Sequence, residues 1–331
     1  MSTLSFGVDF DDPALEFRVR AGVEETERQL DAAVDTNQRF IAEAAAHLLN
    51  AGGKRFRPLL VMLCAEFGDP TATDIVPAAV VVELTHLATL YHDDVMDDAP
   101  LRRGAESANV RYDNSIAILV GDYLFAQAST IVSYLGPEAV RIQAQTFSRL
   151  VQGQIRETMR PDDGEDPLQH YLGVVADKTG SLIATSARLG AKMSGASVEI
   201  ELALTEFGER IGAAFQLSDD IIDISSETDD SGKTPGTDLR EGVPTLPVLF
   251  ALQGTDPADA RLRELLSQPL VDDGLHTEAL TLLRAHRAMD EARAYVRAEA
   301  DAARAMLSTL PAGSARAALE ALCDTVVTRL G

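Results

Sequence analysis

The chain has 331 residues, of which 29 are Lys or Arg and 52 are Asp or Glu, giving a formal net charge of −23. This length can bury a sizeable core, and the negative charge argues against non-specific binding to nucleic acids, which are polyanions. Hydrophobic residues make up 46% and aromatic residues only 5%, with no Trp. The composition therefore favours helices over sheets, because strands prefer β-branched and aromatic residues.

Apolar residues recur at spacings of three and four along most of the chain, which predicts a succession of helices. Breaks rich in Gly, Pro and Asp separate the segments, and no alternating strand pattern competes with them. In chain order the predicted helices are 22–51, 58–66, 73–97, 115–134, 137–156, 168–190, 199–224 and 257–266, with further helical segments in 277–310 and 313–329. We expect an all-α, single-domain bundle of about ten or more helices around a central active-site cavity. Residues 1–20 are expected to be a loosely ordered N-terminal segment.

Residues 225–247 form a long break between two predicted helices and contain Gly232, Lys233 and Gly242. Loops of this length are usually functional. We therefore expect this segment to be a flap over a site.

The cysteines and the N-terminus indicate where the protein works. Cys64 and Cys323 lie in apolar runs and are expected to be buried thiols in a reducing compartment, not a disulfide. The N-terminus lacks the basic-then-apolar pattern of a signal peptide, and no run approaches the ~20 apolar residues of a membrane span. We expect a cytoplasmic protein with no stable membrane span.

A first acidic cluster closes the predicted helix 73–97. Asp93 and Asp97 are four residues apart and share one helical face, and Asp94 and Asp98 form a second such pair. Carboxylates at a helix C-terminus are unfavourable because they repel one another and oppose the helix dipole. A cation should neutralise them, and Mg²⁺ suits such sites because it takes one or two carboxylates together with phosphate oxygens.

A second acidic cluster, Asp219, Asp220 and Asp223, lies among apolar residues of the predicted helix 199–224. One acidic pair alone is typical of a solvated helix face. Two copies, each on an otherwise apolar helix, instead favour two carboxylate sets that hold a diphosphate through bridging metal ions.

Cations are scarce in this acidic chain, yet they gather beside the first cluster. Three lie within Gly52–Pro58, at a turn that leads into a helix, where free N–H groups also favour anions. Arg102 and Arg103 directly follow the first cluster and could bind a diphosphate bidentately. His86 stands two helical turns before Asp93 on nearly the same face, although a satisfied core histidine would read the same way.

These motifs, in this order, resemble those of the trans-isoprenyl diphosphate synthases (polyprenyl synthetases), and the likeness runs from Gly52 to Pro247. The resemblance implies the isoprenoid synthase fold and a prenyltransferase that condenses isopentenyl diphosphate head-to-tail onto an allylic diphosphate of the farnesyl or geranylgeranyl type. The implied reaction is ionisation, condensation and elimination, with release of diphosphate. The resemblance also implies a homodimer and about three Mg²⁺ ions per active site.

Residue roles follow from the same resemblance. The implied metal ligands are Asp93, Asp94, Asp97, Asp219, Asp220 and Asp223. The implied isopentenyl diphosphate contacts are Lys54, Arg57, His86 and Arg103. The implied allylic diphosphate contacts are Arg102, Lys178, Thr179, Gln216 and Lys233. The implied catalytic set is Asp93, Asp94, Asp97, Arg102, Lys178 and Asp219. Val243 stands where the family often has Lys, so that lysine's role is not carried over, and Asp98 is assigned no metal.

Product length can be argued from the helix that ends at Asp93. If the growing tail runs down this helix, each turn of ~5.4 Å accommodates about one isoprene unit. The gate positions on the face of Asp93 are Ala88, Thr89 and Thr85, and none is aromatic. Open gates predict a long all-trans product of about six to ten units, unless Phe125 or Tyr123 plugs the path from another helix.

Four alternatives stay open. A geranylgeranyl diphosphate synthase would show the same motifs, and product chromatography separates it from a long-chain enzyme. A terpene cyclase or head-to-head enzyme shares the helical pattern, but a cyclase needs no second diphosphate site. A non-catalytic subunit of a heteromeric synthase would usually have lost acidic residues. A helical scaffold that binds divalent cations leaves the clustered cations unexplained.

Overall fold

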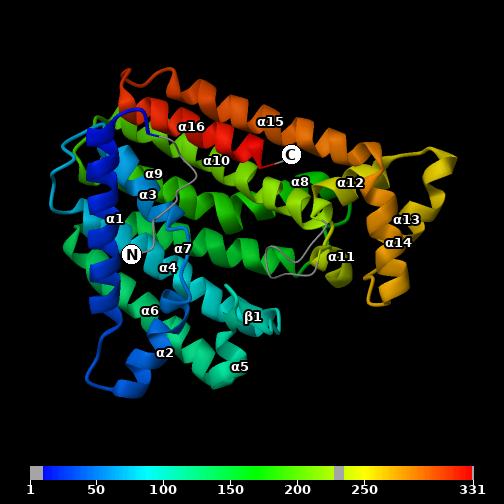
Figure 1. Ribbon diagram of the computed structural model, residues 1–331, viewed down its shortest axis with the longest axis horizontal. Coiled ribbons are helices and arrows are strands. Elements are labelled where there is room, and N and C mark those ends of the chain that lie inside the picture. Colours follow the sequence, from blue (N-terminus) through cyan, green and yellow to red (C-terminus); the bar gives the residue numbers. More distant parts are fainter. Residues whose placement is uncertain (1–9, 227–234, 330–331) are drawn as a thin grey trace. The chain divides into compact units, whose positions relative to one another are not determined.

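The computed structural model describes residues 10–226 and 235–329 (Figure 1). Most of the described residues are helical, which confirms the all-α prediction. A two-residue strand β1 (Leu101–Arg102) pairs antiparallel with β2 (Ala105–Glu106). The helices are α1 (Pro13–Val34), α2 (Arg39–Asn50), α3 (Phe56–Ala65), α4 (Ile75–Met96), α5 (Ala108–Tyr112), α6 (Asn114–Tyr134), α7 (Pro137–Glu157), α8 (Pro167–Val175), a π-helical turn (Ala176–Gly180), α9 (Ser181–Met193), α10 (Val198–Ser225), α11 (Thr237–Glu241), α12 (Leu246–Gln253), a 3₁₀ turn (Pro257–Asp259), α13 (Ala260–Leu266), α14 (Asp273–Arg284), α15 (Arg287–Leu307) and α16 (Ser314–Thr328).

The structure corrects two predicted helix boundaries near the N-terminus. The predicted helix 22–51 is two helices, α1 and α2, separated at residues 35–38, where the chain reads Asp-Thr-Asn-Gln. Asp, Thr and Asn favour turns because their side chains bond nearby backbone. Residues 13–20, expected to be loosely ordered, are helical. The Asp12 carboxylate accepts from the backbone N–H of Ala14 at 2.8 Å, and Pro13 occupies the first helical position.

Near the C-terminus, the predicted segment 277–310 is also two helices. Helix α14 begins at Asp273, where Asp272 caps it by accepting from the Leu275 N–H at 2.9 Å. It ends at Arg284, and α15 begins three residues later. The α-helical periodicity continues across this short break, so the pattern alone did not reveal it.

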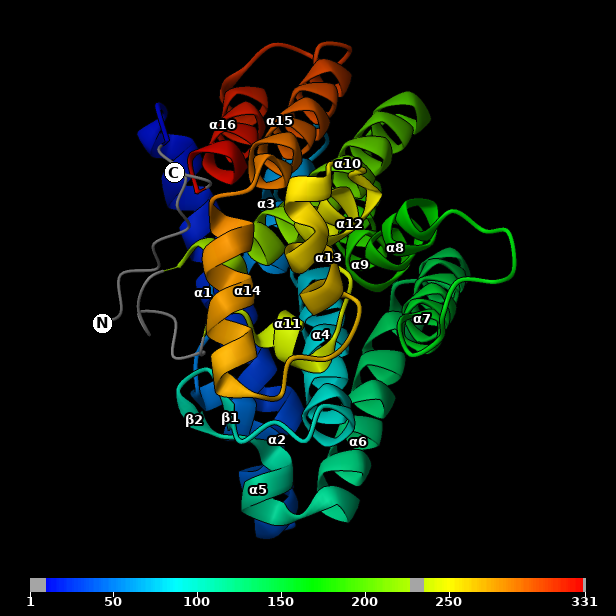
Figure 2. The same ribbon diagram turned by 90° about the vertical axis from the view of Figure 1, so that its right-hand side faces the viewer.

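The chain forms two compact units, and each is described by itself. The first comprises Met1–Ser148, Leu182–Gly208 and Met306–Ala321, and the second comprises Arg149–Ser181, Glu209–Ala305 and Leu322–Gly331. The single domain expected from the sequence stays a prediction. In the second unit, α12, α13 and α14 pack together and α8 packs against α12 (Figure 2).

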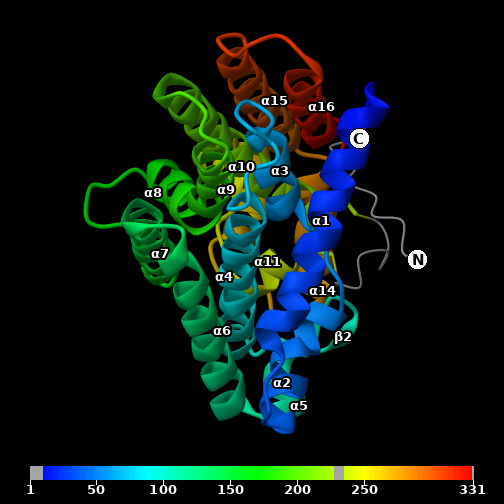
Figure 3. The same ribbon diagram turned by 90° about the vertical axis from the view of Figure 1, so that its left-hand side faces the viewer.

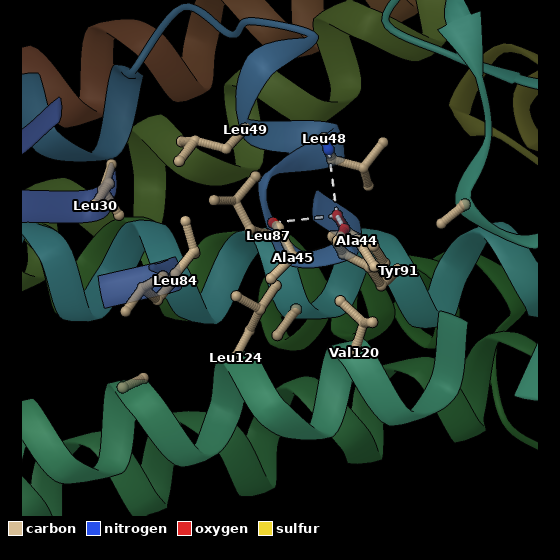
Figure 4. Packing of buried hydrophobic residues seen from close by; sticks show 14 of the residues in the cluster. Leu30, Ala44, Ala45, Leu48, Leu49, Leu84, Leu87, Tyr91, Val120 and Leu124 are labelled. Atoms are coloured by element: carbon tan, nitrogen blue, oxygen red, sulfur yellow. Dashed lines mark hydrogen bonds between the residues drawn. The ribbon is translucent and has the colours of Figure 1, made fainter. Parts of the chain in front are cut away.

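The core of the first unit is built on α4, which packs against α6, α3 and α1 (Figure 3). Leu84, Leu87 and Tyr91 of α4 meet Leu124 of α6 and the apolar face of α2 (Figure 4). The Tyr91 hydroxyl donates to the Ala44 carbonyl at 2.5 Å and accepts from the Leu48 N–H at 3.2 Å. This buried, satisfied side chain fixes the end of α4 that carries the first acidic cluster.

Close contact between α4 and α6 depends on Gly121. A Cβ at this position would lie 2.3 Å from His92 Nε2 and 3.2 Å from the Ala88 carbonyl oxygen. Only glycine therefore lets α6 approach α4 this closely. The two helices form the largest packed pair of the first unit.

The structure confirms the prediction that both cysteines are buried but differs from the prediction that no segment is apolar enough to span a membrane. Cys64 and Cys323 are both free and buried, as predicted, and burial raises the pKa of the Cys64 thiol. Helices α4 and α6 are long and apolar enough to cross a membrane, in contrast to the expectation that no segment comes close. The apolar window of α4 is 67% buried, which is typical of a core helix, whereas that of α6 is 33% buried.

Candidate active site

The first acidic cluster lies in the first unit, at the C-terminal end of α4. Asp94 is fully buried there, and both of its oxygens are occupied by the chain itself. One accepts from Arg102 Nε at 2.6 Å, and the other accepts from the Ala108 N–H at 3.0 Å. Asp94 thus fastens the β1–β2 hairpin and the start of α5 to α4.

The outer aspartates of this cluster are more open. Asp93 is half-buried, and the side chain of Asp97 is 46% exposed, with Oδ2 3.9 Å from Arg102 Nη2. Since Asp94 is engaged by protein donors, Asp93 and Asp97 are the carboxylates better placed to accept a cation. The i, i+4 spacing read from the sequence puts both on one face of the helix end.

The structure brings three of the predicted isopentenyl diphosphate residues together in the first unit. Burial lowers the pKa of Arg57 to about 10, and its Nε has no hydrogen-bond partner among the described residues. Burial and the charges of Arg57 and Arg103 hold the pKa of His86 well below its usual range, so its imidazole is neutral near pH 7. Arg103 donates to the carbonyls of Leu48, at 3.0 Å, and Gly52. Lys54 is exposed.

Arg55 has a different environment from its neighbouring cations. It is buried, adopts a left-handed backbone with φ of 48°, and donates to Glu27 and to Glu83 Oε1, the latter at 3.1 Å. Glu83 lies inside α4 and is 2% exposed. The sequence analysis missed this pair, although a glutamate within the apolar run of α4 signals a buried partner.

The predicted chain-length positions all lie on α4 in the first unit. Ala88 and Thr85 are buried, and Thr89 is half-buried with its hydroxyl donating to the His86 carbonyl at 2.7 Å. Phe125, named as a candidate plug, contacts Phe147 of α7 in a tilted arrangement, with ring centroids 4.4 Å apart and an angle of 54° between the ring planes. Tyr123 packs against the apolar core of α4 and α6.

The second acidic cluster lies in the second unit, along α10. Asp220 is buried, and it accepts from the Tyr171 hydroxyl and from Gln216 Nε2, the latter at 2.9 Å. Burial raises the pKa of Asp220 to about 6, with Asp219 and Asp223 acting in the same direction. Like Asp94, the middle residue of this cluster is engaged by protein donors, and no sequence pattern pointed to Tyr171.

Asp219 and Asp223 have more accessible positions. Asp219 is 40% exposed and pairs with Arg329, whose guanidinium also lies 4.6 Å from the centre of the Phe215 ring. Asp223 Oδ2 accepts from the Asp238 N–H at 3.4 Å, and its carbonyl accepts from the Gly236 N–H at 2.9 Å. The C-terminal part of the predicted flap is therefore tied to α10, whereas Lys233 lies outside the described residues.

Lys178 and Thr179 sit on the π-helical turn between α8 and α9. Such turns are frequent at functional sites. Thr179 Oγ1 donates to Gln216 Oε1 at 3.0 Å, which links the turn to Asp220, and Lys178 Nζ pairs with Glu157. A Cβ at Gly153 would lie 2.6 Å from the Lys178 nitrogen, so α7 touches this turn directly.

Arg149, which the sequence analysis did not single out, holds the same turn in place. Its Nε donates to Asp177 Oδ1 at 2.9 Å, and its Nη2 donates to Glu209 Oε2 at 3.1 Å and to the Ala176 carbonyl at 3.3 Å. These ion pairs raise the pKa of Arg149, with the hydrogen bond to Glu209 as the largest cause. The arginine thereby connects α7, the π-helical turn and α10 within the second unit.

The carboxylates of each acidic cluster suit an open Mg²⁺ site better than a site in which the protein supplies every ligand. Within residues 10–226 and 235–329, no three His, Cys, Asp or Glu side chains converge to hold a metal ion. Each acidic cluster instead offers two outer carboxylates on one helical face. Mg²⁺ is commonly held by one or two carboxylates, with waters and substrate phosphates completing its shell.

Comparison with known proteins identifies the family. Residues 38–283 match the family model described as polyprenyl synthetase. The chain belongs to the polyprenyl synthetase family. The fold and the enzyme class inferred from the sequence, an all-α prenyltransferase, are confirmed.

Individual relatives agree on the family but differ in their named products. A nonaprenyl diphosphate synthase of Mycobacterium tuberculosis is 50% identical over 331 residues, covering 100% of this chain and 99% of that one. Component 2 of a heptaprenyl diphosphate synthase of Bacillus subtilis is 37% identical over 92% of this chain and 86% of that one. A geranylgeranyl pyrophosphate synthase of Corynebacterium glutamicum, solved with calcium and isoprenyl diphosphate, superposes with a TM-score of 0.88 at 46% identity, covering 98% of this chain and 100% of that one.

Proposed function

We propose that this prenyltransferase is a long-chain all-trans polyprenyl diphosphate synthase, which adds isopentenyl diphosphate repeatedly to an allylic diphosphate. The observation that carries the proposal is the absence of an aromatic side chain at Ala88, Thr89 and Thr85 on α4. A bulky ring there would stop growth early. The 50% identity to a nonaprenyl diphosphate synthase supports the same reading.

A geranylgeranyl diphosphate synthase is the second candidate. It is supported by the 46% identity and TM-score of 0.88 to an enzyme of that name. The hydrogen bond from Gln143 Nε2 on α7 to Thr85 Oγ1 also favours it, because it puts an amide beside one of the proposed gate positions. The two candidates differ only in where growth stops, so their products separate them.

The two substrates are proposed to be bound by two different sets of residues. Isopentenyl diphosphate would contact Lys54, Arg57, His86 and Arg103, with the neutral His86 ring acting as a hydrogen-bonding group. The allylic diphosphate would contact Arg102, Lys178, Thr179, Gln216 and Lys233. The unpartnered Arg57 Nε supports the first assignment, because a buried guanidinium nitrogen without an acceptor is costly unless a ligand supplies one.

We propose Mg²⁺, about three ions per active site, as the cofactor. Asp93, Asp97, Asp219 and Asp223 would hold it. Asp94 and Asp220, both implied as ligands by the resemblance, are only 0% and 6% exposed, and we propose that they position the more exposed outer carboxylates. Bound Mg²⁺ would offset negative charge on the diphosphate.

The chain's own residues support an ionisation–condensation–elimination reaction. The cations of Arg102 and Lys178 would stabilise charge that develops on the leaving diphosphate. Buried apolar side chains of α4, including Val81 and Leu84, would keep water from an allylic cation. The final proton can leave with the departing diphosphate, so the reaction needs no side-chain base.

A homodimer is proposed on the exposed face of α6. Ile118 and Leu119 are 43% and 61% exposed, and exposed Ala126 and Ser129 continue the same helix. Exposed apolar patches commonly mark protein interfaces. A second copy fits this face better than a bilayer, because the exposed Asp122 lies in its middle. We also propose a cytoplasmic location, because both cysteines are free and buried, as is common in reducing compartments.

Product analysis tests the function directly. The purified chain is incubated with isopentenyl diphosphate, farnesyl or geranylgeranyl diphosphate, and Mg²⁺, and the dephosphorylated products are separated by chromatography. The proposal expects chains of about six to ten isoprene units. A product of four units would favour the second candidate, and no turnover by the chain alone would favour a subunit of a heteromeric enzyme.

A further inference from the structure

The buried side chain of Gln143 on α7 bonds directly to Thr85 on α4. Gln143 Nε2 donates to Thr85 Oγ1 at 2.6 Å, and Thr85 Oγ1 donates to the Val81 carbonyl at 2.7 Å. Because a threonine hydroxyl carries one proton, Thr85 can only accept from Gln143. The amide NH₂ group must therefore face Thr85.

The other end of the same amide has no partner. Gln143 is 7% exposed, and its Oε1 is buried without a hydrogen bond among the described residues. Buried polar atoms are normally satisfied. One hydrogen bond, to Thr85, thus joins the amide on α7 to α4. Among the described residues, the amide oxygen makes no hydrogen bond that would keep the side chain in this position.

This bond lies at a definite depth below the first acidic cluster. Thr85 is eight residues before Asp93, which corresponds to ~12 Å along the helix. That distance matches about two extended isoprene units. With the unit that carries the diphosphate and the space around the amide, a tail would meet Gln143 after about three to four units.

We infer that the Gln143–Thr85 hydrogen bond is a crossbar that sets how much of the product stops at about four units and how much grows on to six or more. A tail of up to about four units fits above it, and further growth requires the amide to leave Thr85 and swing aside. This inference rests on the proposed function and deepens it, because Gln143 becomes a specificity-determining residue on a different helix from Ala88, Thr89 and Thr85. It also explains how the non-aromatic side chains of Ala88, Thr89 and Thr85 can occur together with an amide that limits the growing tail.

Three variants test the crossbar through the product distribution. Thr85→Val keeps the volume but removes the acceptor, and Gln143→Ala removes the amide. Both should raise the mean product length by about one unit or more and reduce the four-unit product. Gln143→Phe puts a rigid ring at the same place and should shorten the product to about four units or fewer. Gln145→Ala, an exposed glutamine on the same helix, is the matched control and should leave the distribution unchanged.

The outcomes separate this inference from the proposed function. Isopentenyl diphosphate incorporation is measured beside product length for each protein. Wild-type lengths in Thr85→Val and Gln143→Ala, with incorporation retained, would overturn the crossbar and leave the proposed function standing. Failure of the wild-type chain to incorporate isopentenyl diphosphate would overturn both. Because Thr85→Val is nearly isosteric, the core should fold and the test does not depend on the larger substitutions.

Discussion

Replacing Glu83 with Gln should weaken both the fold and the binding of isopentenyl diphosphate. Glu83 and Arg55 are 2% and 4% exposed at their side chains, so neither charge is solvated by water. Removing one partner of a buried pair costs about 3–5 kcal/mol. The lower end applies because Arg55 keeps Glu27 and the Leu49 carbonyl as acceptors. For a chain of this size, ~3 kcal/mol lowers the melting temperature by about 4 °C.

The same substitution should affect one substrate more than the other. Arg55 precedes α3 and holds the segment that carries Lys54 and Arg57, so its loosening should raise KM for isopentenyl diphosphate. KM for the allylic substrate should change little. Thermal melts and steady-state kinetics, with each diphosphate varied in turn, measure both effects. Glu27→Gln is the control, because Glu27 is 32% exposed and its loss should cost less. A melting temperature within about 1 °C of wild type (about 0.7 kcal/mol), or equal changes in both KM values, would refute the reasoning.

Three further predictions concern the acidic clusters, the tail path and the subunit interface. Asp93→Ala or Asp219→Ala should lower turnover at least about a hundredfold, while calorimetry should still detect isopentenyl diphosphate binding. Asp98→Asn is the control. Near-normal turnover in either alanine variant would argue against the two-cluster account. Ala88→Phe should shorten the product to a few units with diphosphate release retained, and an unchanged chromatogram would remove the tail path from α4. Ile118→Asp should convert a dimer to a monomer in analytical ultracentrifugation, and an unaltered sedimentation coefficient would place the interface elsewhere.

The sequence predicted those features that depend on short-range pattern. Helix α4 and the spacing of Asp93 and Asp97 follow from residues within a few turns of one another. The division between α1 and α2 was missed because apolar residues keep helical spacing across it, while the turn residues at 35–37 stop the helix. The start of α1 was missed although Asp12 followed by Pro13 is a helix-start signal.

Partners distant in the sequence could not be predicted from spacing. Asp220 meets Tyr171 49 residues away, Thr85 meets Gln143 58 residues away, and Asp219 meets Arg329 110 residues away. Spacing gives the face on which a side chain lies, but not the donors that occupy it. For this reason the sequence treated all three aspartates of each cluster alike, whereas the structure distinguishes the buried middle residue from the two outer ones.

The length of the hydrocarbon made by the purified protein tests the central claim most directly. Isopentenyl diphosphate in excess, farnesyl diphosphate as primer and Mg²⁺ are incubated with the chain alone, and the dephosphorylated alcohols are compared with standards of known length. The account predicts a dominant product of about six to ten isoprene units. Growth that ends at about four units under these conditions, or no incorporation, would contradict it.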